Sequence, residues 1–186
     1  KERAFNRVGT EIQRMETLVQ DLLLLAELGE SGARDIEKID LSEILIAHGT
    51  DFTTLNPQRK VKLTIAAGVT IEASRDYMAR FIQNALTNIV RHTDNDVPVN
   101  ISLATRGKHA ELVIEDGGKG LPESAYREDI RSLNRFDKSR SRENGGSGLG
   151  MSIMSAVISK LGGRFSLRRS NLGGLAIVVE LPLVKD

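Results

Sequence analysis

The order of helix-type and strand-type patterns along the chain constrains its fold more than any other feature. Alternation of apolar and polar residues, which is typical of strands, occurs in three pairs of segments: 61–66 with 69–73, 97–105 with 110–115, and 163–167 with 175–181. Helix-type spacing occurs at 40–55, 74–92 and 150–161. Short connections favour antiparallel strands, and helices between strand pairs cover one face of a sheet. We therefore expect an α+β fold, a sandwich in which helices cover one face of an antiparallel sheet.

Local signals mark where the helices should begin and end. Asp40 followed by Glu43 resembles a capping box, and Asn56-Pro57 should terminate the helix that starts there. Ser74 is a typical N-cap for the next helix. The stretch 117–150 has three glycine clusters and many charges, so we expect a long functional loop that contains a short helix.

The N-terminal residues form a separate amphipathic helix. Its apolar stripe has spacings of three and four residues: Val8, Ile12, Met15, Val19, Leu22 and Ala26. Two interpretations remain open, packing against this chain's own domain and pairing as half of a helical hairpin with a missing partner. Gly29, Ser31 and Gly32 should end the helix. We expect this helical appendage at 1–30, a linker at 31–39 and one domain at 40–186.

Composition excludes several classes of protein. The 186 residues contain 26 Lys and Arg against 25 Asp and Glu, so no overall field favours nucleic acid or anionic lipid. Aromatic residues are only 4% of the chain, too few for a platform that stacks bases. Cys is absent, and the three His are isolated, which argues against a zinc site. No apolar run reaches the roughly 18 residues that span a bilayer, so we expect a soluble chain.

Two asparagines on the helix at 74–92 form the first candidate site. Asn84 and Asn88 stand four residues apart and should project from one face, with Arg91 one turn further on. An amide oxygen suits Mg²⁺, which shares its ligands with substrate phosphates, and Arg91 could neutralise a phosphate oxygen. Without other signals, two such Asn residues would more often be ordinary surface residues.

A carboxylate at a strand end forms the second candidate site. Asp116 directly follows the strand at 110–115 and precedes Gly117, Gly118 and Gly120. With no side chains in the way, it can accept a hydrogen bond from the exocyclic amine of a flat ring such as adenine. The alternative is a plain turn, in which Asp and Gly are common.

The third candidate site is a glycine-rich segment at 145–150 that opens the helix at 150–161. Such a segment exposes backbone N–H groups to an anion, which favours polyphosphate. Residues 131–142 add an excess of four positive charges, since they hold five Arg or Lys and only Asp137. An ordinary solvated loop is the alternative. The segment lacks the Gly-Lys-Ser/Thr of a P-loop.

Each pattern is modest alone, but their order and intervals closely resemble sensor histidine kinases. The segments 84–93, 116–120, 135–136 and 146–150 match the family's N, G1, F and G2 boxes. Residues 14–23 are similar to the second helix of the family's dimerisation and phosphotransfer hairpin. The resemblance implies the ATP-binding fold shared with gyrase, heat-shock and mismatch-repair ATPases, a two-layer α/β sandwich with a mixed, mostly antiparallel sheet.

The resemblance also implies roles for individual residues. Asn88 would hold Mg²⁺, Asp116 would bind the adenine amino group, and Phe136 would anchor a lid whose glycines close on the nucleotide. With ATP and Mg²⁺ as cofactors, the implied binding set is Asn84, Asn88, Arg91, His92, Asp116, Gly118, Gly120, Phe136, Lys138, Arg140, Gly146, Ser147, Gly148, Leu149 and Gly150.

One departure from the family is large. None of His48, His92 and His109 lies in the phosphoacceptor context, in which Glu or Asp follows the His and a Pro is near. We therefore expect a kinase fragment that transfers the γ-phosphate of ATP to a histidine outside this chain, for relay to a response-regulator Asp. The family resemblance implies a cytoplasmic domain and a membrane-anchored full-length protein that dimerises through the N-terminal helix. Composition and charge already argue against a nucleic-acid partner.

Two other functions are weighed against the kinase. A catalytically silent module could sense nucleotide and control docking while no phosphate moves. A protein serine kinase of the anti-sigma type has similar glycine boxes, but Asn84 and the heptad helix disfavour it. Asn84 also occupies the position at which hydrolytic relatives carry a Glu that activates water, so we expect slow ATP hydrolysis.

Overall fold

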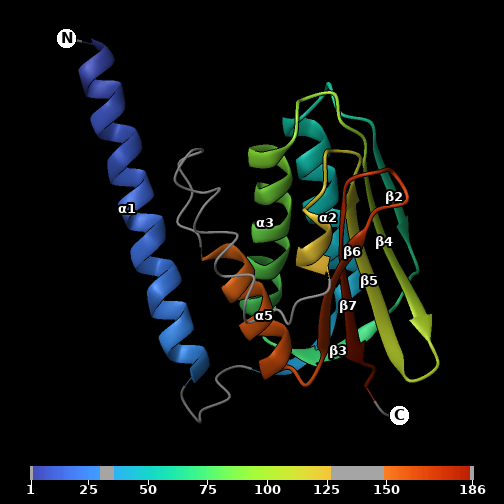
Figure 1. The fold of residues 1–186 in the computed structure, drawn as a ribbon. Coiled ribbons are helices and arrows are strands. Elements are labelled where there is room, and N and C mark those ends of the chain that lie inside the picture. The colour runs from blue at the N-terminus through green and yellow to red at the C-terminus, as the bar shows by residue number, and fades with distance from the viewer. Residues whose placement is uncertain (1, 30–35, 127–148, 185–186) are drawn as a thin grey trace.

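The computed structural model describes residues 2–29, 36–126 and 149–184. Helices and strands form an α+β fold in which helices cover one face of a sheet (Figure 1). The helices are α1 Glu2–Gly29, α2 Leu41–Leu55, α3 Arg75–His92 and α5 Gly150–Lys160, with a short 3-10 helix η1 at Glu123–Tyr126. The strands are β1 Glu37–Asp40, β2 Val61–Ile65, β3 Thr70–Ala73, β4 Val99–Arg106, β5 His109–Asp116, β6 Arg164–Arg169 and β7 Leu175–Pro182.

The main sheet has five strands in the order β2-β4-β5-β7-β6. Only the β2–β4 pair is parallel, and the other three pairs are antiparallel. The predicted two-layer sandwich with a mixed, mostly antiparallel sheet is therefore confirmed. In the β4–β5 hairpin Val99 lies opposite Asp116, which places Asp116 at the end away from the hairpin turn.

The segment 61–73 differs from a simple pair of strands. β2 joins the main sheet beside β4, whereas β3 pairs with β1 in a separate two-stranded sheet. The hydroxyl of Ser42 binds the turn between β2 and β3, because it donates to Ala66 O at 2.7 Å and accepts from Val69 N at 3.0 Å. β1 begins at Glu37, inside the stretch expected to be linker.

The predicted helix starts agree with the structure, with one difference in chemistry. Asp40 caps α2 by accepting a hydrogen bond from Glu43 N at 3.1 Å. Ser74 occupies the N-cap position of α3, but its side chain makes no cap hydrogen bond. Asn56 ends α2, as expected from the proline that follows.

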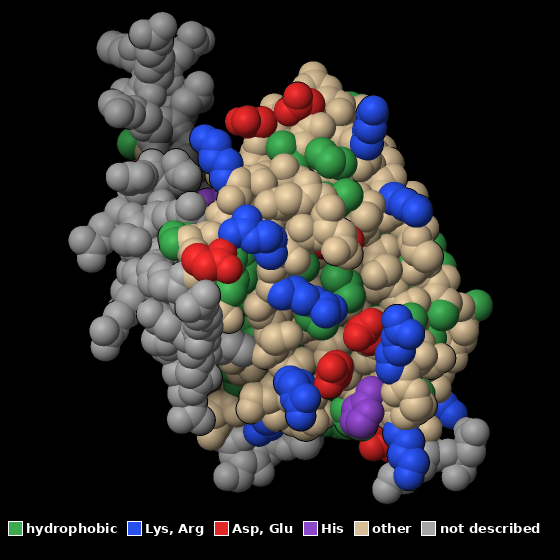
Figure 2. Space-filling view, turned by 45° about the vertical axis from the view of Figure 1, so that its right-hand side comes forward, with side chains coloured by type: hydrophobic (Ala, Val, Ile, Leu, Met, Phe, Trp, Pro, Cys, Tyr) green, Lys and Arg blue, Asp and Glu red, His purple; other side chains and the backbone are tan. Residues whose placement is uncertain are grey.

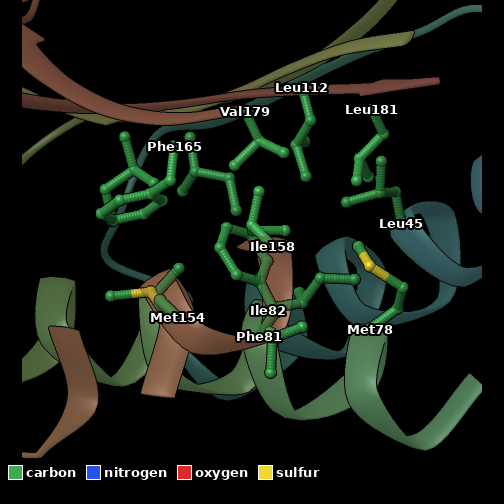
Figure 3. Close-up of a cluster of buried hydrophobic side chains, with 14 of the residues drawn as sticks. Leu45, Met78, Phe81, Ile82, Leu112, Met154, Ile158, Phe165, Val179 and Leu181 are labelled. Atoms are coloured by element: carbon green, nitrogen blue, oxygen red, sulfur yellow. The ribbon is translucent and has the colours of Figure 1, made fainter. Parts of the chain in front are cut away.

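The core lies between the sheet and the three helices α2, α3 and α5. Phe81 of α3 meets Phe165 of β6 edge to face, with ring centroids 6.3 Å apart. Figure 3 shows helix side chains facing strand side chains; the labelled residues are Leu45, Met78, Phe81, Ile82, Leu112, Met154, Ile158, Phe165, Val179 and Leu181. This packing fixes α3 and α5 side by side, and these two helices carry the candidate site.

Helix α1 lies along the outside of the domain, next to α5 (Figure 1). Its C-terminal half packs inward, since Asp21, Leu24 and Leu28 are buried. Its opposite face leaves six apolar side chains exposed: Val8, Ile12, Met15, Val19, Leu22 and Leu23. The helix thus contacts its own domain and also presents an apolar stripe without cover from the described residues.

The remaining surface is mixed in charge. Figure 2 shows Lys and Arg side chains interspersed with Asp and Glu side chains over one face, and hydrophobic side chains in small groups. Among the described helices, none has the length and apolar character needed to cross a membrane.

Candidate functional site

Helix α3 brings its two predicted asparagines to the start of α5. A Cβ built on Gly150 would lie 3.3 Å from Asn84 Oδ1 and 3.5 Å from Asn88 Oδ1. Asn84 is held in place because its Nδ2 donates to Arg80 O at 2.9 Å. Asn88 makes no hydrogen bond with the described residues, so its amide is available to a ligand. The structure therefore places Asn84, Asn88 and Gly150 together, as predicted.

Arg91 and His92 occupy the last turn of α3, and both are exposed. Their place on the helix that carries Asn84 and Asn88 agrees with the sequence pattern. Their contacts with phosphate or base stay predictions. No group of three His, Cys, Asp or Glu residues that could hold a metal occurs within the described part of the chain.

Asp116 lies at the end of β5 and is only 6% exposed. Its Oδ1 accepts from Gly118 N at 2.8 Å and from Leu175 N at 3.4 Å. No hydrogen bond joins Oδ2 to the described residues. A buried carboxylate with one oxygen bound to the backbone and one left over fits a ligand that donates a hydrogen bond.

Burial raises the pKa of Asp116 above its ordinary value. The N–H groups of Gly118 and Leu175 and the positive charge of Arg59 lower this pKa in part, and the neighbouring Glu115 raises it. Burial therefore makes the ionised form of this carboxylate less favourable than it is in water, and such perturbed groups are common at binding sites.

The glycines around Asp116 are sites of close packing. A Cβ on Gly118 would lie 2.7 Å from Thr93 Cγ2, and one on Gly174 would overlap Asp116 Oδ1. Gly120 has φ +67°, and a Cβ there would lie 2.7 Å from the Tyr126 hydroxyl. Gly118 and Gly120 thus shape this end of the site, but the predicted closure of a lid on the nucleotide is untested.

Sequence reasoning missed three residues of this end. Thr93, at the C-cap of α3, touches the Gly118 turn. Arg59 donates from Nη1 to Thr93 Oγ1 at 2.8 Å and from Nη2 to Thr93 O at 3.2 Å. Gly174 packs on Asp116 from the β6–β7 turn. The Gly173-Gly174 pair was a usable signal, whereas nothing near Arg59 in the sequence indicates its partner.

The third predicted segment is described only in part. Leu149 is the N-cap of α5 and packs against the core, and Gly150 is the first helical residue. Phe136, Lys138, Arg140, Gly146, Ser147 and Gly148 lie outside the described residues.

The two groups of residues lie along one helix. Asn84 and Asn88 of α3 lie beside Gly150 at the start of α5. Thr93, at the C-terminal end of α3, contacts the Gly118 turn, whose backbone N–H donates to Asp116. The arrangement can coordinate a metal with an amide oxygen at one end and accept a hydrogen bond from a flat ring at the other.

The fold and the comparison with known families assign the chain to one class of ATP-binding domain. The family described as histidine kinase-, DNA gyrase B-, and HSP90-like ATPase matches residues 73–185. The chain belongs to this family, and the predicted resemblance to sensor histidine kinases is confirmed.

Similar proteins extend the match to nearly the whole chain. The signal transduction histidine-protein kinase BaeS of Escherichia coli is 31% identical over 95% of this chain, and the probable sensor histidine kinase TcrY of Mycobacterium tuberculosis is 32% identical over 97%. The chain spans 38% of the length of each. The solved structure of full-length ShkA with AMPPNP shares the fold, with a TM-score of 0.74 and 20% identity over 99% of this chain and 38% of that chain.

Proposed function

We propose that this chain binds Mg-ATP and donates the γ-phosphate to a phosphoacceptor histidine outside it, for relay to a response-regulator Asp. The observation that supports the proposal is that Asn84 and Asn88 of α3 lie beside Gly150, while Asp116 accepts from Gly118 N in the turn that packs on Thr93, the C-cap of the same helix. Relatives named as sensor histidine kinases support the reaction class.

The adenine end rests on Asp116. Oδ2 would accept from the adenine amine while Oδ1 keeps its bonds to Gly118 N and Leu175 N. Thr93 and Gly118 would bound the ring, because their close contact leaves no room for a larger side chain at 118.

The phosphate end rests on Asn88 and the start of α5. Asn88 would supply an amide oxygen to Mg²⁺, which neutralises charge on the transferred phosphoryl group. Asn84 would line the nucleotide without activating water, since an amide cannot take a proton as a carboxylate does. Slow hydrolysis without an acceptor follows. Arg91, His92, Leu149 and Gly150 complete this end, with the six predicted residues that fall in 136–148.

Helix α1 would belong to the dimerisation and phosphotransfer hairpin. Its exposed stripe, Val8 to Leu23, supports pairing with further helices, including those of a second copy in the full-length protein. We propose 1–30 as the hairpin helix, 31–39 as a linker whose last residues form the start of β1, and 40–186 as the ATP-binding domain. We further propose that the domain works on the cytoplasmic side of a membrane-anchored sensor, a proposal that rests on its similarity to proteins named as sensor histidine kinases.

A transfer assay tests the reaction. The chain is mixed with Mg²⁺, ATP labelled at the γ-phosphate and a separately purified phosphoacceptor hairpin of a sensor kinase. We expect acid-labile, alkali-stable label on the hairpin, and loss of at least about tenfold in rate for Asn88→Ala. Gln83→Ala, an exposed change on the same helix, is the matched control and should transfer normally.

Other results would select the other functions. Nucleotide-dependent docking of the hairpin without label would indicate a sensing module. Acid-stable label on Ser would indicate a serine kinase. Rapid release of free phosphate without any acceptor would contradict the kinase and favour an ATPase motor. A wild-type response of Asn88→Ala to Mg²⁺ would remove Asn88 from the metal site.

A further inference from the structure

Arg59 is a buried cation outside every motif of the site. It lies between α2 and β2, only 5% of its surface is exposed, and its backbone N–H is fixed to Asn56 O at 3.0 Å. A guanidinium is costly to remove from water unless its donors are satisfied, so such a residue needs a physical reason.

The two terminal nitrogens of Arg59 both donate hydrogen bonds to Thr93. Nη1 donates to Thr93 Oγ1 and Nη2 to Thr93 O, while Thr93 Oγ1 itself donates to Ile89 O at 2.6 Å. Arg59 therefore fixes both the side chain and the backbone of the residue at which α3 ends. A fork of two donors holds orientation as well as distance, which a lysine cannot do.

Thr93 passes this constraint to the adenine end of the site. Its Cγ2 lies against the Gly118 turn, closely enough that a Cβ at 118 would be 2.7 Å away. Gly118 N in turn donates to Asp116 Oδ1 at 2.8 Å. Three steps of contact thus join Arg59 to the carboxylate that would recognise the base.

Electrostatic attraction also links Arg59 to Asp116. Asp116, Asp94 and Asp96 all stabilise the Arg59 cation, and Arg59 in return lowers the pKa of Asp116, against the raising effects of burial and Glu115. The Arg59 Nε makes no hydrogen bond with any residue the structure describes. The guanidinium is retained despite that cost.

We propose that Arg59 is a positioning residue for base recognition, which sets the Gly118 turn through Thr93 and so aims Asp116 at the exocyclic amine of adenine. This inference rests on the proposed role of Asp116. It predicts that Arg59 controls discrimination between bases, while phosphate binding at Asn88 stays unaffected.

Calorimetric titration with ADP and with IDP measures that discrimination. IDP keeps the phosphates and ribose but presents a carbonyl oxygen where ADP presents its amine. We expect the wild-type chain to prefer ADP, and Arg59→Met to lose about fivefold or more of that preference, with IDP affinity nearly unchanged. Arg59→Lys keeps the charge and loses the fork, so it should recover only part of the preference.

Two further variants keep the test decisive. Thr93→Val keeps the methyl group against Gly118 and removes the hydroxyl that Arg59 binds, so it should lower the preference even if Arg59→Met fails to fold. Arg106→Met, at the opposite end of the β4–β5 hairpin, is the matched control and should bind both nucleotides as wild type does.

The outcomes separate this inference from the proposed function. Asp116→Asn should abolish the preference for ADP, and an unchanged preference there would remove Asp116 from the adenine pocket. If Asp116→Asn abolishes the preference while Arg59→Met and Thr93→Val keep it, Arg59 has no positioning role. Equal losses for ADP and IDP in the Arg59 and Thr93 variants would indicate a structural role alone and overturn the inference.

Discussion

Asp116, the proposed adenine-binding residue, is subject to two opposing effects of burial. Its burial makes the ionised form unfavourable, while the same burial strengthens any hydrogen bond it accepts from a ligand. The backbone donors Gly118 N and Leu175 N offset part of that cost. In the proposed role, Asp116 would favour adenine binding at the expense of the stability of the fold.

Replacing Asp116 with Asn should separate the two effects. Asn keeps Oδ1 as acceptor for Gly118 N, but its Nδ2 would face the adenine amine as donor against donor. We expect ADP affinity to fall by roughly 1 to 3 kcal/mol. Because the folded-state pKa of Asp116 is raised, the folded chain loses stability as pH rises from 3.8 through that pKa, so the variant should melt higher at pH 7.

Thermal unfolding at several pH values checks the predicted gain in stability, and calorimetry with ADP checks the predicted loss of affinity. The gain in melting temperature should shrink as pH falls toward 3.8. Asp51→Asn, an exposed change on α2, serves as control and should leave melting and affinity nearly unchanged. A lower melting temperature for Asp116→Asn at pH 7 would contradict the cost assigned to its charge.

At the scale of elements, the connection between β2 and β3 decides how the two sheets separate. Ser42, near the start of α2, bonds Ala66 O and Val69 N and so holds the turn from which the strands leave in different directions. Leu41 N adds a bond to Val69 O at 2.9 Å. The start of α2 thus fixes strand partners far along the chain.

Ser42→Ala should destabilise the domain by about 1 to 3 kcal/mol, because it leaves the buried Val69 N–H without its partner and also removes the bond to Ala66 O. Denaturant unfolding monitored by circular dichroism measures the loss. Ser166→Ala, exposed on β6, should change stability by less than about 0.5 kcal/mol. Equal stability of the two variants would show that this turn does not depend on the Ser42 hydroxyl.

Most of the fold could be predicted from periodicity, but strand partners could not. The β4–β5 hairpin and the helices α2, α3 and α5 follow from local patterns and caps. The parallel β2–β4 pair and the β1–β3 pair depend on contacts distant in sequence, which alternation does not encode. For the same reason sequence motifs indicate Asn84, Asn88 and Asp116 as candidates, whereas no local pattern indicates Arg59, which lies 34 residues from its partner Thr93.

At the scale of the whole molecule, α1 is the least covered element. Asp21, Leu24 and Leu28 tie its end to the domain, and the apolar stripe from Val8 to Leu23 faces outward. Burying such a stripe in a helical partner would release about 25 cal/mol per Å² of apolar surface. The two interpretations of this helix are therefore compatible, because they use opposite faces.

Introducing charge on that stripe should weaken self-association. Ile12→Glu with Val19→Glu would place carboxylates in any helix–helix seam, so the weight-average mass should rise less with concentration than for the unaltered chain. Sedimentation velocity measures it, and Glu16→Gln on the same helix is the control. ADP affinity should not change. Identical association of the charged and unaltered chains would count against dimerisation through α1.

Helix α3 carries Asn88 and ends at Thr93, which packs against the Gly118 turn beside Asp116. Asn88 and Thr93 stand five positions apart, which corresponds to about 7.5 Å of helical rise. Under the proposed roles, this fixed spacing would set the distance between the metal at Asn88 and the base at Asp116. Nucleoside diphosphates and triphosphates would then bind with the base and the metal in the same relative position. Discrimination between ATP and ADP would then depend on residues that contact the terminal phosphate, farther along the phosphate chain than the groups near Gly150.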